Sequence, residues 1–171
     1  MTDDRSESIE TLRQRYLQEG RYIHKNEDRI AFFEEIGEMA EAAGAAAWKK
    51  FADGMAAWVR EDMEAALGLF DEALALDPKF AYPWNGKGLV LGAQKRYDEA
   101  MAAYEQSISL DPEFAYPWNG KGNVLDHQKR YDEALAAYEK AITLDPECAY
   151  PWYGKGNIMR SQKRYDEALA A

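Results

Sequence analysis

The chain has 171 residues, of which 47% are hydrophobic, and its formal net charge is −10. The hydrophobic content is enough to bury a continuous core, and the acidic balance argues against a surface that binds nucleic-acid phosphates. The chain has a single cysteine, Cys148, which excludes an internal disulfide. Because it also has only two histidines, we expect neither a metal cluster nor another cofactor.

The N-terminal stretch "MTDDRSESIETLRQRYLQEG" contains acidic residues where a secretion signal needs a basic start and an apolar run. The sequence also lacks an apolar stretch of about 18 residues, the length that a membrane-spanning helix needs. We therefore expect a cytoplasmic protein that does not bind membranes.

Residues 1–46 do not share the pattern of the rest of the chain, and they are predicted to form two or more helices. Leu12 and Tyr16 share one helical face, and Phe33 and Ile36 share another. We expect this segment to cap the first unit of the array described next, because stacked repeats need their open ends covered.

From residue 47 onward the sequence repeats every 34 residues. The stretch "AYPWNGKG" begins at Ala81 and again at Ala115, and "AYPWYGKG" begins at Ala149. A fixed period of this size indicates stacked structural repeats. The units are 47–80, which is degenerate, 81–114, 115–148, and 149–171, which is truncated.

Each unit is predicted to be a hairpin of two helices. In the second unit, Pro83 suits the first turn of a helix, where its missing N–H loses no partner. Ala100 and Tyr104 recur at helical spacing in the second helix, and Asp98 is placed to cap or favour the start of that helix. The residue before Pro112 is pushed out of the helical region, so the helix is expected to end there.

A glycine in the first helix of each unit costs about 1 kcal/mol relative to alanine, so a packing contact must offset it. We expect Gly122 to let Ala134 of the paired helix pack almost against backbone, while Trp118 fills the wider gap toward the neighbouring helix. The equivalent pairs are Gly88–Ala100 and Gly156–Ala168.

Seven positions carry the pattern of the unit. At positions 4, 8, 17, 20, 24, 27 and 32 the third unit has Trp118, Gly122, Tyr131, Ala134, Tyr138, Ala141 and Pro146. This pattern, in phase over residues 47–171, closely resembles the tetratricopeptide repeat. The resemblance implies an all-α fold: a right-handed superhelical solenoid of antiparallel helix hairpins, here preceded by N-terminal helices.

Two positions depart from the family pattern. Position seven is often leucine in the family and is Lys87, Lys121 and Lys155 here. Position six is asparagine in many members and is Gly86, Gly120 and Gly154 here. Two glycines around a lysine are expected to loosen the first helix of each hairpin.

Within the first helix, the non-conservative differences between the well-formed units fall at positions five, nine, twelve and thirteen, which share one helical face. Plain solvent exposure is one explanation of this variable face. The resemblance implies another, because in the family this face and position two line a concave groove that contacts a partner. The predicted groove residues are Tyr82, Asn85, Leu89, Tyr116, Asn119, Asn123, Asp126, His127, Tyr150, Tyr153, Asn157 and Arg160.

We therefore expect a non-enzymatic scaffold that binds a partner peptide or helix in this groove. The family's carboxylate clamp for chaperone tails combines lysine and arginine with asparagine, and Arg160 is the single cation near the groove asparagines, so this match is poor. The alternative function is a structural, self-assembling spacer or a fragment of a longer multidomain protein.

The truncated fourth unit predicts a homodimer through the C-terminal end. Its second helix stops before the aromatic position, which leaves Trp152, Tyr165 and Leu169 without part of their packing partner. Exposed apolar patches of this kind favour association, most simply across a two-fold axis. Fraying of the last half-helix is the competing outcome.

Overall fold

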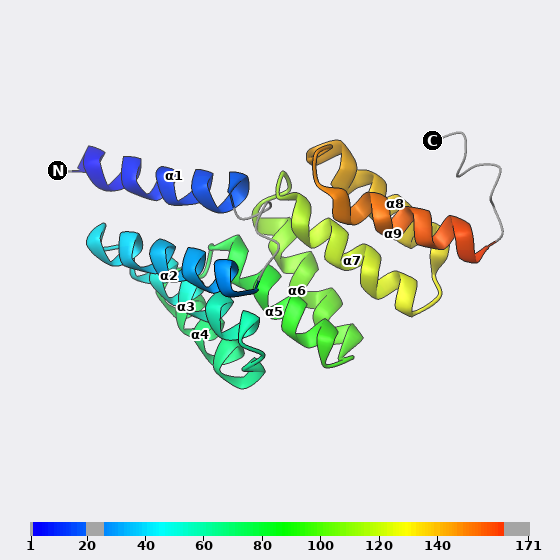
Figure 1. Ribbon diagram of the computed structural model, residues 1–171, viewed down its shortest axis with the longest axis horizontal. Coiled ribbons are helices and arrows are strands. Elements are labelled where there is room, and N and C mark those ends of the chain that lie inside the picture. The colour runs from blue at the N-terminus through cyan, green and yellow to red at the C-terminus, as the bar shows by residue number, and fades with distance from the viewer. Residues whose placement is uncertain (1, 20–25, 163–171) are drawn as a thin grey trace. The chain divides into compact units, whose positions relative to one another are not determined.

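Helices account for all the regular structure in residues 2–19 and 26–162, which are the residues that this computed structural model describes. In chain order the helices are α1 (Thr2–Gln18), α2 (Asn26–Ala42), α3 (Ala46–Val59), α4 (Met63–Leu76), α5 (Ala81–Ala93), α6 (Tyr97–Leu110), α7 (Ala115–His127), α8 (Tyr131–Leu144) and α9 (Ala149–Ser161) (Figure 1). The chain divides into two compact units, Met1–Val90 and Leu91–Ala171. The all-α prediction is confirmed.

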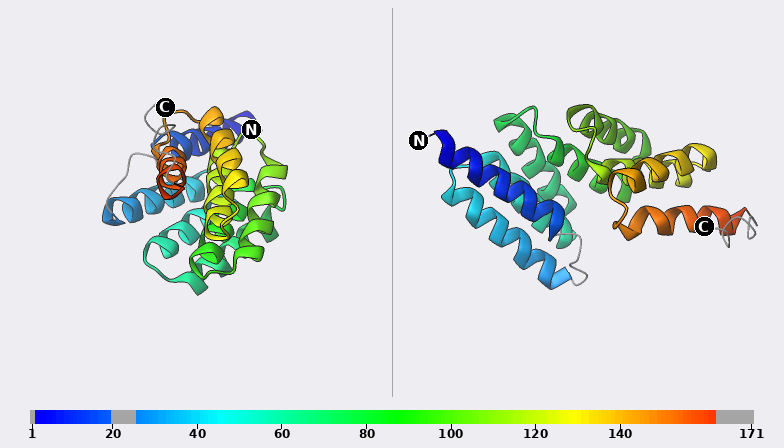
Figure 2. Two further views of the ribbon diagram at one scale, coloured as in Figure 1. Left: turned by 90° about the vertical axis from the view of Figure 1, so that its right-hand side faces the viewer. Right: turned by 90° about the horizontal axis from the view of Figure 1, so that it is seen from above.

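In the first compact unit, α2 packs against α3, and α3 packs against α4. Helices α1 and α2 run antiparallel and side by side (Figures 1 and 2). The core is rich in aromatic residues, and Ile36, Phe51 and Phe70 are completely buried. Tyr16 brings α1 into this core, because the centroid of its ring lies 5.2 Å from that of Phe51.

In the second compact unit, α7 packs against α6 and α8, and α9 contacts both α7 and α8. Leu125 of α7, Tyr138 of α8 and Ile158 of α9 meet in one buried cluster with Ala134 and Ala137. Consecutive hairpins therefore share a continuous core within this unit, as expected for stacked repeats.

The start of α6 differs from the prediction in one detail. The N-cap residue is Arg96, whose side chain makes no capping hydrogen bond, and Asp98 lies inside the first turn together with Glu99. Asp98 therefore favours the helix through its charge near the N-terminus rather than as a cap. The helix ends at Leu110, directly before Asp111 and Pro112, as the proline predicts.

The turns that join α5 to α6 and α7 to α8 each place a non-glycine residue in the left-handed region. Lys95 has φ 61° and Lys129 has φ 62°. At the first of these turns the N–H of Arg96 donates to the carbonyl oxygen of Leu91 at 2.9 Å, and the N–H of Lys95 donates to that of Gly92 at 3.0 Å. This pair of bonds is the Schellman ending of a helix, a place where glycine is usual.

The partner predicted for Gly122 is wrong. A Cβ added at this glycine would lie 2.5 Å from the ring of Tyr138, whose atoms rather than those of Ala134 are its nearest neighbours. A Cβ added at Gly154 of the next hairpin would also lie 2.5 Å from that ring. Tyr138 is thus held between two glycine backbones, one from its own hairpin and one from the next. Ala168, the predicted partner of Gly156, lies outside the described residues.

The lysine at position seven joins successive hairpins. Its Nζ lies close to a carboxylate of the preceding second helix in three places: Lys87 to Asp71 at 2.6 Å, Lys121 to Glu105 at 2.7 Å and Lys155 to Glu139 at 2.9 Å. The acidic partner is always 16 residues earlier in the chain. The departure at position seven therefore supplies a repeated polar contact, while the expected softness of the first helices stays a prediction.

Candidate functional site

The predicted groove residues of α5 are not equally accessible. Tyr82 is 4% exposed and Asn85 is 2% exposed, whereas Leu89 is half-buried. Two of the three positions are thus already covered in the first compact unit. Tyr82 is covered by residues of the N-terminal helix α1.

Helix α1 lies on the aromatic residues at position two of the first repeats. Nε of Arg13 donates a hydrogen bond to the hydroxyl of Tyr82 at 2.9 Å. The ring of Tyr16 lies 5.2 Å from Tyr82 and 6.4 Å from Trp48, which occupies position two of the first repeat. The sequence indicated the apolar face of α1 that includes Tyr16, but no local pattern pointed to Tyr82 as its partner or to Arg13 as a contact residue.

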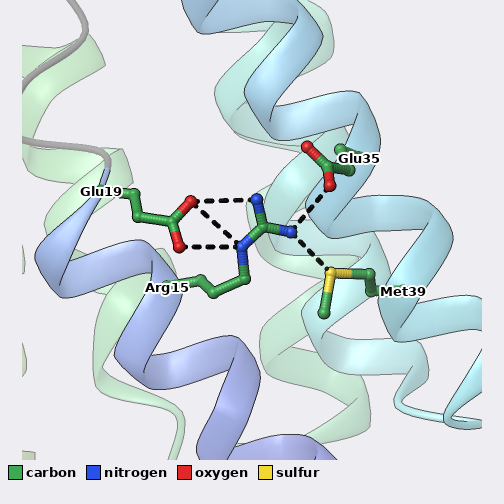
Figure 3. A network of polar contacts seen from close by, with 4 residues as sticks. All are labelled: Arg15, Glu19, Glu35 and Met39. Carbon is green, nitrogen blue, oxygen red and sulfur yellow. Dashed lines mark hydrogen bonds and ion pairs between the residues drawn. The ribbon is translucent and has the colours of Figure 1, made fainter.

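Arg15 fixes α1 to α2 on another side (Figure 3). Its Nη1 donates to Glu35 at 2.9 Å and to the sulfur of Met39, and its Nε and Nη2 donate to Glu19 of its own segment. The hydrogen bonds to Glu35 and Glu19 raise the pKa of Arg15, and the same guanidinium lowers the pKa of Glu35. The pairs are largely exposed, so they orient α1 more than they stabilise the fold.

The corresponding residues of the second compact unit are more open. Tyr116 and Asn119 of α7 are half-buried, and Asn123 and His127 are exposed. On α9, Tyr150 is 56% exposed and Tyr153 is 71% exposed, while Asp126 and Asn157 are half-buried and Arg160 is exposed. Because α7 and α9 contact each other, equivalent positions of two repeats are brought together here.

Two hydrogen bonds and one stacked pair of rings order this surface. The hydroxyl of Tyr138 donates to Oδ1 of Asn123 at 2.8 Å, and burial, with a smaller contribution from the charge of Asp126, raises the pKa of Tyr138. Nη2 of Arg160 donates to Oδ1 of Asn157 at 2.8 Å. The ring of His127 stacks on Tyr97 with centroids 5.4 Å apart and planes at 14°. The amide groups of Asn123 and Asn157 are therefore held in fixed orientations.

Exposed aromatic side chains gather on α9. Besides Tyr150 and Tyr153, Trp152 is 46% exposed, and its Nε1 donates to the carbonyl oxygen of Pro146 at 3.2 Å. Tyr150 and Tyr153 are three residues apart and therefore lie on one side of the helix. We call these two residues the open tyrosine face. Aromatic residues that combine apolar area with a polar group are enriched at protein interfaces.

Cys148 is buried directly before α9, at the position where the other units have Phe80 and Phe114. It therefore packs as a replacement for phenylalanine. Within the described ranges, the helices are all too short or too polar to cross a lipid bilayer.

Comparison with known proteins identifies the repeats. Residues 81–114 and residues 115–148 each match the family model of the tetratricopeptide repeat. A comparison with curated proteins found no match. Solved structures, by contrast, give many matches.

Three of these structures illustrate the likeness. The Sgt2 TPR domain from Aspergillus fumigatus has a TM-score of 0.64 at 21% identity, covering 71% of this chain and 82% of the domain. A MamA RS-1 double mutant has a TM-score of 0.62 at 23% identity, covering 98% of this chain and 90% of that one. The first TPR of Spaghetti (RPAP3), bound to the HSP90 peptide SRMEEVD, has a TM-score of 0.64 at 14% identity, covering 69% and 94%. At these identities the likeness shows a shared fold. Residues 81–148 are thus identified as two tetratricopeptide repeats, in a fold that the chain shares with TPR domains.

Proposed function

We propose that this protein is a non-enzymatic interaction scaffold, and that it binds a partner peptide or helix on the first-helix face of residues 115–162. The observation that carries the proposal is the open tyrosine face of α9, where Tyr150 and Tyr153 are 56% and 71% exposed. Helix α7 contributes Asn123 and His127, which are also exposed. Large aromatic groups beside oriented amides provide stacking area and hydrogen bonds for an incoming chain.

The comparison with Spaghetti (RPAP3) supports peptide binding as a use of this fold, since that structure holds an HSP90 peptide. The peptide SRMEEVD is acidic at its end, and an acidic tail needs several cations to bind it. Of the predicted groove positions, only position twelve of α9 supplies a cation, and that residue, Arg160, donates to Asn157. We therefore propose a partner other than an acidic chaperone tail.

Three further expectations belong to this proposal. Residues 1–46 act as the cap of the array, which is supported by the packing of α2 against α3. Nucleic acid is not a partner, because the net charge of −10 opposes phosphate binding. The cytoplasmic location stays a prediction.

The proposal is tested by photo-cross-linking in extract of the host cells. A photoreactive phenylalanine replaces Tyr153 in one variant and Leu76 in the control, because Leu76 is also exposed but lies on α4. We expect defined partners to cross-link at position 153 and not at position 76. We also expect these partners to be lost from pull-downs with Tyr150→Ala/Tyr153→Ala. Identical capture from both positions, or pull-downs unchanged by the double variant, would contradict the proposal.

Self-association through the C-terminal end is a second candidate, favoured by the 46% exposure of Trp152. Tyr165 and Leu169, the other residues predicted at this interface, lie outside the described residues. Light scattering over a hundredfold concentration range is the test. A dimer mass that is lost in Trp152→Glu would support this candidate, and a constant monomer mass would contradict it.

A further inference from the structure

The first compact unit shows how a helix binds to the position-two residues of these repeats. Trp48 and Tyr82 occupy position two of successive repeats, and both are buried beneath α1. The helix meets them side by side, because one ring, that of Tyr16, contacts both. The position-two face is therefore a helix-binding surface in this protein.

The contact residues of α1 follow a simple pattern. Tyr16 is 7% exposed, and its ring packs against those of Tyr82 and Trp48. Arg13, three residues earlier, donates to the hydroxyl of Tyr82. Leu12 instead lies beside Met39 and Ala42 of α2. The surface of the repeats thus recognises an aromatic residue by ring packing and an arginine by a hydrogen bond to the tyrosine hydroxyl.

The tyrosine of this surface recurs without a cover on α9. Tyr150 stands two repeats after Tyr82, in the same "AYPW" sequence and at the same helical position. Its side chain is 56% exposed, whereas that of Tyr82 is 4% exposed. Tyr153, one turn further along α9, extends the open surface.

The helix α1 of a second copy is a poor candidate to cover this face. In each copy α1 is tethered beside its own Trp48 and Tyr82, where the effective concentration of a linked segment reaches the millimolar range. It is held there also by the contacts of Arg15 with Glu35 and Met39 (Figure 3). A helix of another protein faces no such competing site. The net charge of −10 on this chain further favours a partner segment that carries arginine.

We propose that the open tyrosine face binds an amphipathic helix of a partner protein with an aromatic residue and an arginine three residues before it, as in Tyr16 and Arg13 of α1. The proposal rests on the proposed function and specifies the chemistry of the partner. The arginine donates to the hydroxyl of Tyr150, and the aromatic residue packs against the rings of Tyr150 and Tyr153.

The probe for this proposal is a synthetic peptide of residues 2–18 with blocked ends, added to the full-length protein. We expect fluorescence anisotropy of the labelled peptide to show saturable binding that Tyr150→Ala weakens about tenfold. The control variant Leu76→Ala, on α4, is expected to leave the Kd unchanged. Binding that Tyr150→Ala does not alter would mean that the peptide displaces α1 from Tyr82, and it would overturn the proposal.

A double-mutant cycle tests the arginine contact without removing the ring. Tyr150→Phe in the protein and Arg13→Ala in the peptide are each expected to weaken binding about three- to tenfold, and the pair is expected to be no worse than either alone. Additive losses would overturn the assigned hydrogen bond. Circular dichroism of Tyr150→Phe confirms that the fold is intact.

The partners that cross-link at position 153 separate this inference from the proposed function. A cross-linked partner segment that is helical and carries the aromatic residue and the arginine supports the inference. If partners cross-link there but the peptide does not bind and the captured segment is extended or lacks arginine, the inference fails and the proposed function survives. If nothing cross-links at position 153, the proposed function itself fails.

Discussion

The ring of Phe70 lies so close to the backbone of Gly86 that a Cβ added to the glycine would come within 2.5 Å of the ring. Gly54, in the same hairpin as Phe70, lies against the same ring, and a Cβ added to Gly54 would lie 2.7 Å from a ring carbon. Phe70 is completely buried, so it has no room to move aside. The glycines at positions six and eight therefore form the two sides of a slot for the aromatic residue at position twenty-four.

Gly86→Ala is expected to lower the free energy of unfolding by about 1–3 kcal/mol, because the new methyl group overpacks the slot. The matched control is Gly68→Ala on α4, where an added Cβ meets nothing within 4 Å. That change is expected to raise stability by about 0.5–1 kcal/mol through helix propensity alone. Urea denaturation of both variants makes the comparison, and a stabilising Gly86→Ala would contradict the slot.

Two tryptophans at the same repeat position are expected to differ in their contribution to stability. Trp118 is half-buried in the middle of its compact unit, and its Nε1 is fully covered. Trp152 is 46% exposed. Trp118→Ala should cost about 3 kcal/mol and Trp152→Ala about 1 kcal/mol, since the loss follows the buried area and the cavity left behind. Equal losses in chemical denaturation would be inconsistent with this order.

Tyr138 makes stability sensitive to alkaline pH. Burial raises its pKa in the folded chain, so the unfolded chain ionises first as the pH rises past about 10. Stabilisation by Tyr138 is therefore complete below pH 10 and is lost as the pH rises toward the folded-state pKa. Tyr138→Phe is expected to cost about 1 kcal/mol at pH 7, where it removes the bond to Asn123. Above pH 10 the decline should become less steep but should not vanish, because burial also raises the pKa of Tyr104.

The control for this titration is Tyr150→Phe, because Tyr150 is exposed. Its unfolding free energy should decline above pH 10 as steeply as that of the wild type. Denaturation curves at about pH 7, 9, 10 and 11 provide the data. A Tyr138→Phe profile that parallels the wild type throughout would exclude Tyr138 as the titrating group.

Lys129 has φ 62° at the end of α7, which is unfavourable for a side chain with a Cβ. Lys129→Gly is expected to raise the unfolding temperature, with a gain of about 0.5–1 kcal/mol. The adjacent Gln128 has φ −79°, so Gln128→Gly should instead be neutral or destabilising. Calorimetry of the two variants should give shifts of opposite sign, or a shift for Lys129→Gly alone.

The hairpins were predictable because their signals are local. Proline and the spacing of apolar positions each act within one helix or turn, and the 34-residue repeat shows where each unit begins again. The bounds of α6, Tyr97–Leu110, can therefore be predicted almost directly from the sequence. The partner of Gly122 was not predictable in this way. It depends on the axial position of one helix relative to the helix that packs against it. In the structure this position places Tyr138 rather than Ala134 against the glycine.

The candidate site was predictable only in part for a related reason. Repeat position identified Tyr82 and Tyr150 as equivalent residues, but it contains no information on which of them is covered. The cover comes from Arg13, 69 residues away in the chain, in a segment that lacks the repeat pattern. This contact joins a repeated segment to a segment that occurs once, so it produces no periodic pattern in the sequence from which it could be predicted.

Lys87 lies 16 residues after its partner Asp71, and Gly86 lies the same distance after Phe70. The two contacts recur at this spacing between each later pair of successive hairpins. Removing residues 81–114 would bring Lys121 to that distance from Asp71, and Gly120 to that distance from Phe70. The contacts between the second helix of one hairpin and the first helix of the next are thus the same for each neighbouring pair. Recombination between neighbouring units can therefore shorten or lengthen the array by whole hairpins and keep these contacts.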